Sequence, residues 1–408
     1  MNNKKHIVIV TTNFANGGTE RRAMVLANGF VNRGYKVTYL VINKIYADVV
    51  YKLDERIELI SLSDFASSDN VSEEKEISRL HIEKKINKLK ILNKIAKRLR
   101  VDNSLIKRKI NILPDCNILR AFIMYNSDAT IISFGLDIFE KVFRASEGLN
   151  CKLIFSDASA PQFKKNPEEN KLFKCVLSKI LKKANVCIFQ TEEQMKYYGR
   201  CVKYNGLIIK NPITVNMPPV YEGARKHTVV NFCRTHPVKN LILLVDAFKL
   251  FSEKFPDYSL EIYGSTSTET AEKYKAEVIK RIRDLGLEKK ACVYDAIPNV
   301  HEKIFDYGMY VSSSDSEGLS NSMLEAMAMG IPCICTDCEG GGPKEVINDG
   351  ENGLLVPVGD AEAMKDAMCR IVQENGLAEK LSRNATKIRT ELSVENIVNK
   401  WIEIIESK

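Results

Sequence analysis

Two glutamates mark a stretch of the sequence whose residue types and spacing could do chemistry. Glu317 and Glu325 stand eight residues apart in SDSEGLSNSMLEAMAMG, residues 314–330. The pattern predicts a loop and then a short helix that begins at Ser320 or Asn321 and ends at a glycine. The first N–H groups of a helix have no partner inside it and attract a negative group such as a diphosphate. This stretch therefore predicts an anion site at a helix N-terminus.

The two carboxylates suggest different partners for such a site. Glu317 lies just before the helix and would repel a phosphate, so we expect it to accept hydrogen bonds from sugar hydroxyls beside the phosphate. Glu325 lies about one turn inside the helix, from where an acidic side chain can reach a ribose diol. Taken alone, a glutamate at that place is more typical of a solvated helix surface.

Further candidates follow other predicted strands. Arg234 comes after an apolar run and Lys239 stands five residues on, so a planar fork and a point charge could both meet phosphate oxygens. Gly17 and Gly18, and the GGGP stretch at 340–343, would let the backbone approach a ligand closely. Each pattern alone is typical of a tight turn or a surface charge, but their joint occurrence at predicted strand ends favours a site.

The order of apolar runs indicates how these residues are positioned. MYVSSS predicts a strand, so the DSEGL loop lies at its carboxyl end. Such runs alternate with helical patterns from HIVIVTT near the start to GLLVPV near the end, which predicts parallel sheets with right-handed crossovers. Between the halves, KNPITVNMPPVYEGARKH is proline-rich, polar and aperiodic, and indicates a linker.

We therefore expect an α/β fold of two Rossmann-like, doubly wound parallel-sheet domains that face each other across a cleft. The expected N-terminal domain covers residues 1–208 and carries a basic helical insertion at about 63–125. Residues 209–388 form the expected C-terminal domain, and residues 389–408 a helix that crosses back to the N-terminal domain. A chain of 408 residues is too long for one ordinary hydrophobic core and has a length typical of two domains.

The composition indicates the class of protein and the cellular compartment. The chain is 45% hydrophobic and 27% charged, as soluble proteins are, and no run of 18 or more apolar residues predicts a membrane span. Its eleven cysteines are scattered and lie mostly in apolar runs, which predicts buried thiols in a reducing, cytoplasmic compartment. The cysteines of CICTDC alternate within such a run, so we expect no metal site there.

The net charge of +8 is concentrated in one segment. Lys75–Lys109 contains thirteen Lys or Arg and three acidic residues. Apolar residues recur there at helix-like steps, at Leu80, Ile86, Leu89, Ile95 and Leu99. Two interpretations stay open, namely a basic amphipathic helix that contacts an anionic membrane surface and a solvated insertion whose apolar stripe packs on the domain. Nucleic acid is not expected, because interleaved aromatic residues and a recognition module are both lacking.

Four of these motifs resemble one enzyme family. EGLSNSMLEAMAMGIP is similar to the E-x7-E region of retaining, nucleotide-sugar-dependent glycosyltransferases of the GT-B fold, in particular glycosyltransferase family 4. NFANGGTERRAMVLANGF resembles that family's first glycine-rich loop and helix, and NFCRTHPVKN its segment with a paired Arg and Lys. GGGPKEVINDGENGLLVPVGD is similar to its glycine-rich turn and the following strand.

The resemblance implies roles for individual residues. It implies that the N-terminal domain faces the acceptor and the C-terminal domain binds the nucleotide sugar. Three residues would be catalytic and stabilise the leaving diphosphate and the sugar, namely Glu317, Arg234 and Lys239. Donor binding would use Gly17, Gly18, Arg234, Lys239, Glu317, Gly318, Leu319, Ser320, Asn321 and Glu325. The base would lie near Ile297 and Pro298, with no metal and no cofactor.

The implied function is retaining transfer of a hexose or N-acetylhexosamine from a nucleoside-diphosphate sugar, UDP above all. The acceptor would be lipid-linked or a glycan in bacterial-type surface polysaccharide or glycoconjugate biosynthesis. The enzyme would be cytoplasmic and peripheral at the inner face of the cell membrane, which residues 75–109 would contact. Two alternatives stay open, namely a nucleotide-sugar epimerase of the same fold and a membrane-docking protein with a vestigial nucleotide site.

The sequence departs from the family pattern in three places. Many relatives carry a histidine after the strand corresponding to CKLIFSD, where this chain has Asp157, which we consider as a sugar contact in its place. Cys233 replaces the glycine usually found before Arg234, and YDAIPN replaces the residues that lead into the nucleotide-base loop.

Overall fold

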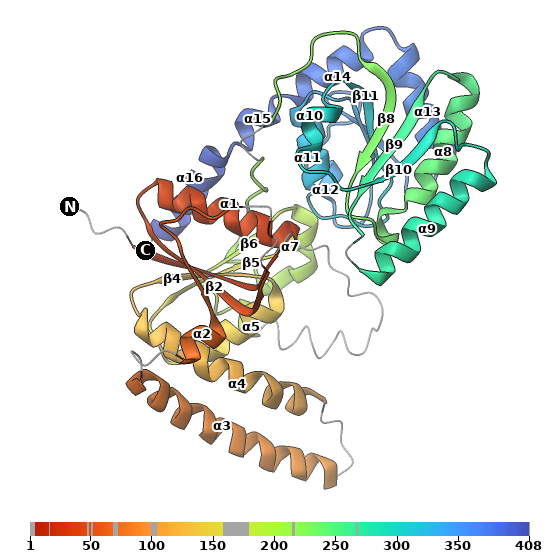
Figure 1. The fold of residues 1–408 in the computed structure, drawn as a ribbon. Coiled ribbons are helices and arrows are strands. Elements are labelled where there is room, and N and C mark those ends of the chain that lie inside the picture. Colours follow the sequence, from red (N-terminus) through yellow and green to blue (C-terminus); the bar gives the residue numbers. More distant parts are fainter. Residues whose placement is uncertain are drawn as a thin grey trace. The chain divides into compact units, whose positions relative to one another are not determined.

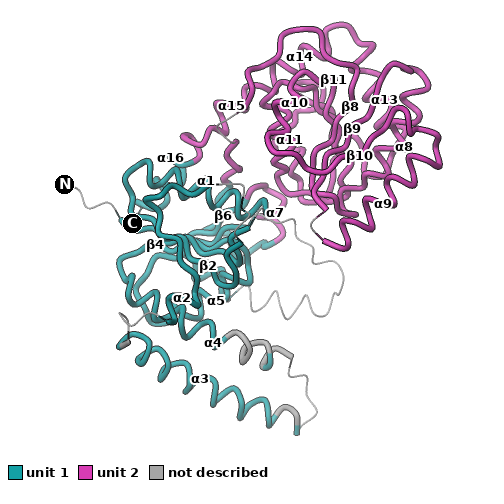
Figure 2. Tube along the Cα trace, viewed as in Figure 1, with its two compact units in different colours: residues 1–189, 198–208, 398–408 teal, residues 190–197, 209–397 magenta. Residues whose placement is uncertain are grey.

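The protein is described from a computed structural model that covers residues 5–15, 17–46, 49, 52–67, 72–98, 104–157, 179–213, 217–266 and 268–407. The chain divides into two compact units (Figure 2). Unit 1 comprises Met1–Phe189, Tyr198–Ile208 and Val398–Lys408, and unit 2 comprises Gln190–Tyr197 and Ile209–Ile397.

Unit 1 is built on a seven-stranded parallel sheet with the order β3-β2-β1-β4-β5-β6-β7 (Figure 1). The central strands form from apolar runs that are buried on both faces, as a sheet covered by helices on both sides requires. The strands are β1 His6–Phe14, β2 Lys36–Ile45, β3 Glu58–Ser61, β4 Thr130–Phe134, β5 Lys152–Ser156, β6 Val186–Phe189 and β7 Gly206–Ile208.

Helices connect and cover this sheet. Helix α1 buries one apolar face and ends before Gly34, whose φ of 80° a side chain would disfavour. Unit 1 contains α1 Gly18–Asn32, α2 Leu62–Ser67, α3 Ser72–Arg98, α4 Ser104–Tyr125, α5 Leu136–Ala145, the short η3 Gly199–Cys201 and most of α16 Val394–Glu406. Helix α7 Glu192–Tyr198 falls almost wholly in unit 2.

Unit 2 repeats the same plan with a six-stranded parallel sheet in the order β10-β9-β8-β11-β12-β13. The strands are β8 Lys226–Phe232, β9 Ser259–Gly264, β10 Ala291–Asp295, β11 Tyr307–Ser312, β12 Cys333–Thr336 and β13 Leu354–Val356. The helices are η4 Pro237–Lys239, α8 Leu241–Lys254, α9 Glu269–Asp284, α10 Val300–Ile304, α11 Asn321–Ala328, α12 Gly342–Val346, α13 Ala361–Gln373, α14 Leu377–Ala385 and α15 Ile388–Glu391.

The strand order of each sheet creates a topological switch point. Chain order runs outward in one direction from β1 and in the other from β4, and likewise from β8 and β11. Helices on either side of such a point diverge and leave room for a ligand at the carboxyl ends of the strands. In unit 2, β8 and β11 are direct neighbours, with Val230 opposite Tyr310. The expected doubly wound sheets are therefore confirmed.

The insertion is a pair of helices, of which α3 packs along α4 (Figure 1). The predicted helix is present, but the predicted stripe does not form one buried face. Leu80 and Ile95 are exposed, whereas Ile82, which the prediction omitted, is buried. Leu99 lies outside the described residues. The side of a helix that is buried depends on the position of its neighbour, which residue spacing alone does not reveal.

Of the helices in the described residues, none combines the length and apolar character needed to cross a bilayer. Helix α16 begins in unit 2 and continues into unit 1, where Trp401 is fully buried against Phe30 and Phe134.

Candidate active site

Two loops of unit 2 meet at the switch point between β8 and β11. Three hydrogen bonds join them. The Asp315 N–H donates to the Val238 carbonyl over 2.9 Å, and the Ser313 hydroxyl donates to the Lys239 carbonyl over 2.9 Å. The Asn240 side-chain amide donates to Asp315 Oδ1 over 2.8 Å. The backbone that carries Lys239 is therefore fixed to the loop that follows β11.

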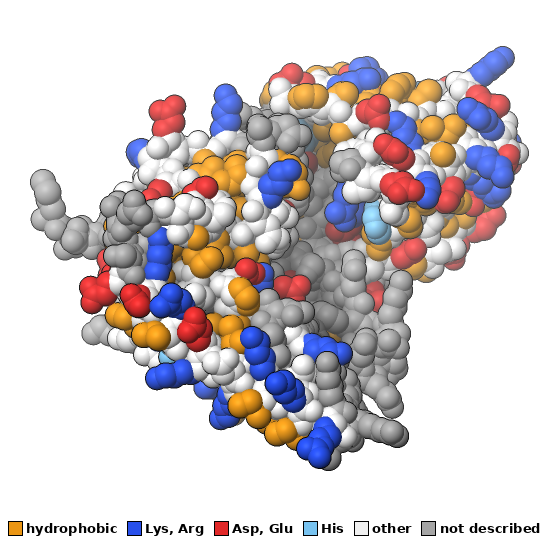
Figure 3. Space-filling view, turned by 60° about the horizontal axis from the view of Figure 1, so that its bottom comes forward, with side chains coloured by type: hydrophobic (Ala, Val, Ile, Leu, Met, Phe, Trp, Pro, Cys, Tyr) orange, Lys and Arg blue, Asp and Glu red, His pale blue; other side chains and the backbone are white. Residues whose placement is uncertain are grey.

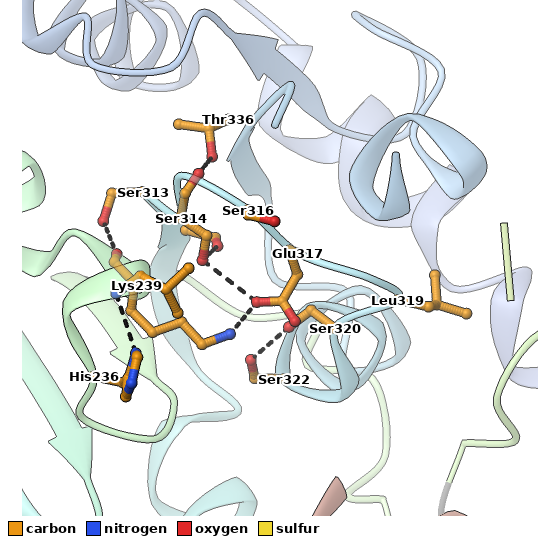
Figure 4. A network of polar contacts seen from close by, with 12 residues as sticks. His236, Lys239, Ser313, Ser314, Ser316, Glu317, Leu319, Ser320, Ser322 and Thr336 are labelled. Atoms are coloured by element: carbon orange, nitrogen blue, oxygen red, sulfur yellow. Dashed lines mark hydrogen bonds and ion pairs between the residues drawn. The ribbon is translucent and has the colours of Figure 1, made fainter. Parts of the chain in front are cut away.

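An ion pair joins the same two loops (Figure 4). The Lys239 ammonium donates to Glu317 Oε2, to which the Ser314 hydroxyl also donates over 3.5 Å. The two charged side chains are only 13% and 17% exposed. Burial disfavours the ammonium, but the Glu317 carboxylate outweighs burial and raises the pKa of Lys239. Lys239 is therefore a permanent positive charge at the end of the sheet.

Arg234 adds a second positive charge near this pair. Its side chain is exposed, and its charge acts on Lys239 and on His236. Burial, followed by Arg234 and Lys239, lowers the pKa of His236, so this imidazole is neutral at neutral pH. Its Nδ1 accepts a hydrogen bond from the Val238 N–H over 3.2 Å. The β8 loop thus carries a positive potential that an anion would relieve.

Helix α11 begins at Asn321, as predicted, four residues after Glu317 of the ion pair. Ser320 occupies the N-cap position, but its side chain caps none of the first N–H groups. Its hydroxyl lies instead 3.0 Å from the Ser322 hydroxyl (Figure 4). The Ser322 hydroxyl is 3.0 Å from the Tyr310 hydroxyl. The start of α11 therefore combines with Lys239 to favour a negatively charged group.

The glycine-rich turn packs directly on the Glu317 loop. The Glu317 N–H donates to the Glu339 carbonyl over 2.8 Å, and a Cβ added to Gly342 would lie 1.6 Å from the Gly318 carbonyl oxygen. Only glycine permits this approach. The GGGP stretch predicted to approach a ligand closely thus approaches the Glu317 loop itself, and Gly341 takes a left-handed φ of 68° to do so.

Glu325 is buried rather than solvated. It is 4% exposed and forms a 2.8 Å hydrogen bond with His301 Nε2, from α10. The His301 ring meets the Phe232 ring edge to face, with centroids 5.8 Å apart. The carboxylate is therefore held by a residue that sequence reasoning did not single out, because His301 lies 24 positions away on another helix.

Two buried amides were also missed. Gln190 Oε1 accepts a hydrogen bond from the Leu319 N–H over 3.2 Å, and Gln190 Nε2 donates to Asn211 Oδ1 over 2.7 Å. Asn211 Nδ2 in turn donates to Asn321 Oδ1 over 3.1 Å. Leu319, a predicted donor contact, is thus tied to the short unit 2 segment Gln190–Tyr197, and Asn321, another, to Asn211 at the start of the segment Ile209–Ile397. Lone Gln and Asn residues carry no sequence signal for such a role.

The predicted base region lies at the sheet edge. Ile297 and Pro298 follow β10 and are exposed. Nearby, the rings of Tyr263 and Tyr294 stack with centroids 5.1 Å apart, and the Lys303 ammonium lies 5.0 Å from each centroid. Of the two tyrosines, Tyr294 is exposed, as Ile297 and Pro298 are, whereas Tyr263 is buried.

The remaining predicted residues belong to unit 1. Gly17 is the N-cap of α1 and Gly18 its first residue. A Cβ on Gly17 would lie 2.0 Å from Glu20 Oε2, so the lack of a side chain there accommodates the Glu20 carboxylate. Contact of these glycines with a donor stays a prediction.

Asp157 has partners of its own inside unit 1. It is 3% exposed, and the Tyr198 hydroxyl donates to its Oδ2 over 2.6 Å. Its carbonyl accepts a 3.4 Å hydrogen bond from Arg22, whose pKa burial lowers to about 10 although the Asp157 charge opposes this. The carboxylate therefore supports a buried cluster, and its proposed contact with a sugar stays a prediction.

Six of the ten described cysteines are buried as predicted, including the three of CICTDC, whereas three are half-buried and Cys292 is exposed. Burial raises the pKa of Cys333 and Cys335 far above the ordinary thiol value, and that of Cys338 to about 12. Within the described part of the chain, no three His, Cys, Asp or Glu side chains gather in an arrangement that could hold a metal ion.

A known protein family matches most of unit 2, which contains the ion pair of Lys239 and Glu317. Residues 221–388 match the family Glycosyl transferases group 1. This region is a glycosyl transferases group 1 domain. The matched region contains every residue of the ion pair, of α11 and of the glycine-rich turn, and it ends before α16.

Similar proteins extend the glycosyltransferase likeness beyond this domain. Over 217 residues the chain is 27% identical to poly(glycerol-phosphate) alpha-glucosyltransferase of Bacillus subtilis, which covers 52% of this chain and 31% of that protein. Over 231 residues it is 28% identical to poly(ribitol-phosphate) alpha-N-acetylglucosaminyltransferase of Staphylococcus aureus, which covers 55% and 44%. The chain thus spans less than half the length of these curated relatives.

A solved structure matches the fold over the full chain. Anabaena HepE in complex with UDP and glucose gives a TM-score of 0.74 at 15% identity and covers 99% of this chain and 100% of that one. The glycosyl transferases group 1 domain and unit 1 together therefore have the GT-B fold.

Proposed function

We propose that the protein is a retaining, metal-independent glycosyltransferase that uses a sugar nucleotide as its donor substrate and needs no cofactor. It transfers a hexose or N-acetylhexosamine from a UDP-sugar to a lipid-linked or glycan acceptor in surface polysaccharide assembly. One observation carries the proposal. The Lys239 ammonium is held at the switch point of a glycosyl transferases group 1 domain, beside the start of α11.

The chemistry follows from where charge develops. As the bond between the anomeric carbon and the diphosphate breaks, negative charge grows on the departing diphosphate and positive charge on the sugar ring. Lys239, Arg234 and the first amides of α11 would stabilise the diphosphate, and Lys239 is already fixed, so it needs little reorganisation. Once a donor phosphate also binds the Lys239 ammonium, the Glu317 carboxylate would accept hydrogen bonds from hydroxyl groups of the donor sugar.

Relatives support the finer assignments. The two curated relatives are named as an alpha-glucosyltransferase and an alpha-N-acetylglucosaminyltransferase. Transfer from an alpha-linked sugar nucleotide to an alpha product retains configuration at the anomeric carbon. HepE is solved with UDP-glucose and with UDP and glucose, which supports uridine as the base.

The proposal includes a cellular setting. A lipid-linked acceptor is met at a membrane surface, so we infer a cytoplasmic enzyme that is peripheral at the inner face of the cell membrane. Its basic segment at residues 75–109 would make the contact, and nucleic acid is not among its partners. Residues 99–103 of this segment lie outside the described part of the chain.

Donor turnover tests the site. Purified protein should hydrolyse a UDP-sugar slowly without acceptor, and Lys239→Ala and Glu317→Ala should each lower the rate by about 100-fold. Lys344→Ala is the matched control, because Lys344 forms an exposed ion pair with Asp337 in the same unit. Unchanged turnover in both site variants would refute the assignment. Conversion of the free donor sugar to its epimer would instead identify an epimerase.

A further inference from the structure

One face of helix α3 packs against the rest of unit 1. Ile82 on that face is 2% exposed, and the neighbouring Ser78 hydroxyl donates to the Asn117 carbonyl of α4 over 2.5 Å. On the flank of the helix, Lys85 forms a 2.5 Å ion pair with Glu147. These contacts attach α3 to unit 1 and leave the opposite side of the helix uncovered by the described residues.

That opposite side carries a continuous line of residues at steps of three and four. At 100° per residue, each member lies within about 60° of the direction opposite Ile82. Four members are large apolar side chains that are 46–60% exposed, and three are basic. We call this line the outer stripe, and it consists of Ile77, Leu80, Lys84, Lys88, Ile91, Ile95 and Arg98.

The outer stripe is positively charged along most of its length. From Lys84 to Arg98 the sequence contains seven Lys or Arg and no Asp or Glu. Of the four acidic residues of α3, Glu76 and Glu83 lie 3.3 and 3.9 Å from the Arg79 guanidinium, and Glu73 and Glu74 lie in the first turn, away from the basic part of the stripe. Figure 3 shows basic and hydrophobic side chains alternating over this helix. An isolated solvated helix would gain nothing from leaving four such apolar side chains in water.

We propose that the outer stripe docks α3 lengthwise on a membrane surface of anionic lipids. Interleaved isoleucines and lysines suit that partner, because the apolar groups enter the acyl boundary while the ammonium groups reach lipid phosphates. A second copy of the chain fits poorly, since two such stripes would bring like charges together. A nucleic acid would leave the isoleucines unused. This inference rests on the proposed function, in which docking would bring the enzyme to a lipid-linked acceptor.

Vesicle binding tests the inference on the full chain. In co-sedimentation, the protein should partition onto phosphatidylcholine vesicles that contain phosphatidylglycerol, not onto pure phosphatidylcholine, and added salt should weaken binding. Lys84→Glu/Lys88→Glu and Ile91→Ser/Ile95→Ser should each lower the partition coefficient by about tenfold. All four residues are exposed, so the fold should survive, as circular dichroism would verify.

Matched controls separate the stripe from overall charge and hydrophobicity. Lys280→Glu/Lys289→Glu makes the same charge change on exposed residues of unit 2, and Val358→Ser removes an apolar side chain that is 42% exposed. Both should bind like the unchanged protein. Equal binding to neutral vesicles, stripe variants that partition like these controls, or a stripe-dependent dimer in sedimentation velocity would each overturn the inference.

Donor hydrolysis without vesicles distinguishes this inference from the proposed function. Stripe variants should hydrolyse a UDP-sugar at the unchanged rate, because the stripe and the ion pair belong to different units. Vesicle binding with no donor turnover in any form would refute the proposed function and leave the docking surface standing. Donor turnover without binding to anionic vesicles would refute the docking surface and leave the proposed function standing.

Discussion

Lys239 and Glu317 meet as a shielded ion pair although 78 positions separate them in the sequence. Each comes from a loop at the carboxyl end of a central strand, and hydrogen bonds through Ser313 and Asp315 lock the two loops together. Lys239 therefore joins the two loops at the switch point of the sheet. Under the proposed function it would also supply the charge that a diphosphate shares with Glu317.

Glu317→Gln should destabilise unit 2 by about 3 kcal/mol at pH 7, because it leaves a buried ammonium without its counter-charge. The pKa of Lys239 is raised in the folded protein, so the pair stabilises below the unfolded lysine pKa, and this contribution disappears as pH rises through the folded value. The difference in unfolding free energy between the unchanged protein and Glu317→Gln, measured by urea unfolding, should therefore become smaller from pH 8 to pH 11. A difference that grows would contradict the ion-pair assignment.

Arg234→Ala should separate binding from stability. The side chain is exposed, so the unfolding free energy should change by less than about 0.5 kcal/mol. Affinity for UDP should fall about tenfold, since one of two positive charges at the β8 loop is lost. Calorimetry at several salt concentrations should also show a weaker salt dependence than in the unchanged protein. Arg283→Ala, on an exposed part of α9, is the matched control.

Glu325→Gln should weaken UDP binding through the ribose. His301 holds one carboxylate oxygen, and a hydrogen bond from a ribose hydroxyl to the charged group is worth about 2 kcal/mol, or about 30-fold in affinity. The unchanged protein should show a similar loss for UDP that lacks its ribose hydroxyls. The variant should bind both nucleotides with nearly equal affinity. A further large loss for the deoxygenated ligand in the variant would place the ribose elsewhere.

Gly342→Ala should disrupt the site through sterics alone. The new Cβ would lie 1.6 Å from the Gly318 carbonyl oxygen, so the glycine-rich turn and the Glu317 loop must separate. We expect a loss of about 2 kcal/mol in stability and of measurable UDP binding. Gly223→Ala is the control, because its Cβ would meet only the end of the Tyr221 side chain, which can move aside. Equal thermal midpoints for both variants would contradict the close approach.

Much of this organisation was predictable from local patterns. Buried strands such as β1 and β11 are continuous apolar runs, and the start of α11 follows from its cap and glycine signals. These features depend on residues that are neighbours in the chain, so the sequence predicts them well. The alternation of such elements was enough to infer two doubly wound sheets.

Other features depend on which surfaces meet. His301 holds Glu325, and Gln190 holds the Leu319 backbone, although no motif marks either residue. Asp157 was considered as a sugar contact because it stands where many relatives carry a histidine, and that contact stays a prediction. Only the structure shows that its carboxylate accepts a hydrogen bond from Tyr198.

The sequence alone determined the order of strands and helices and the types of residue at each strand end, because hydrophobic periodicity and capping act over a few residues. Only the tertiary structure decided that Lys239 pairs with Glu317 and that Ile91 faces outward while Ile82 is buried. Those outcomes depend on the packing of distant segments, whose positions are set by the whole core and not by any local pattern.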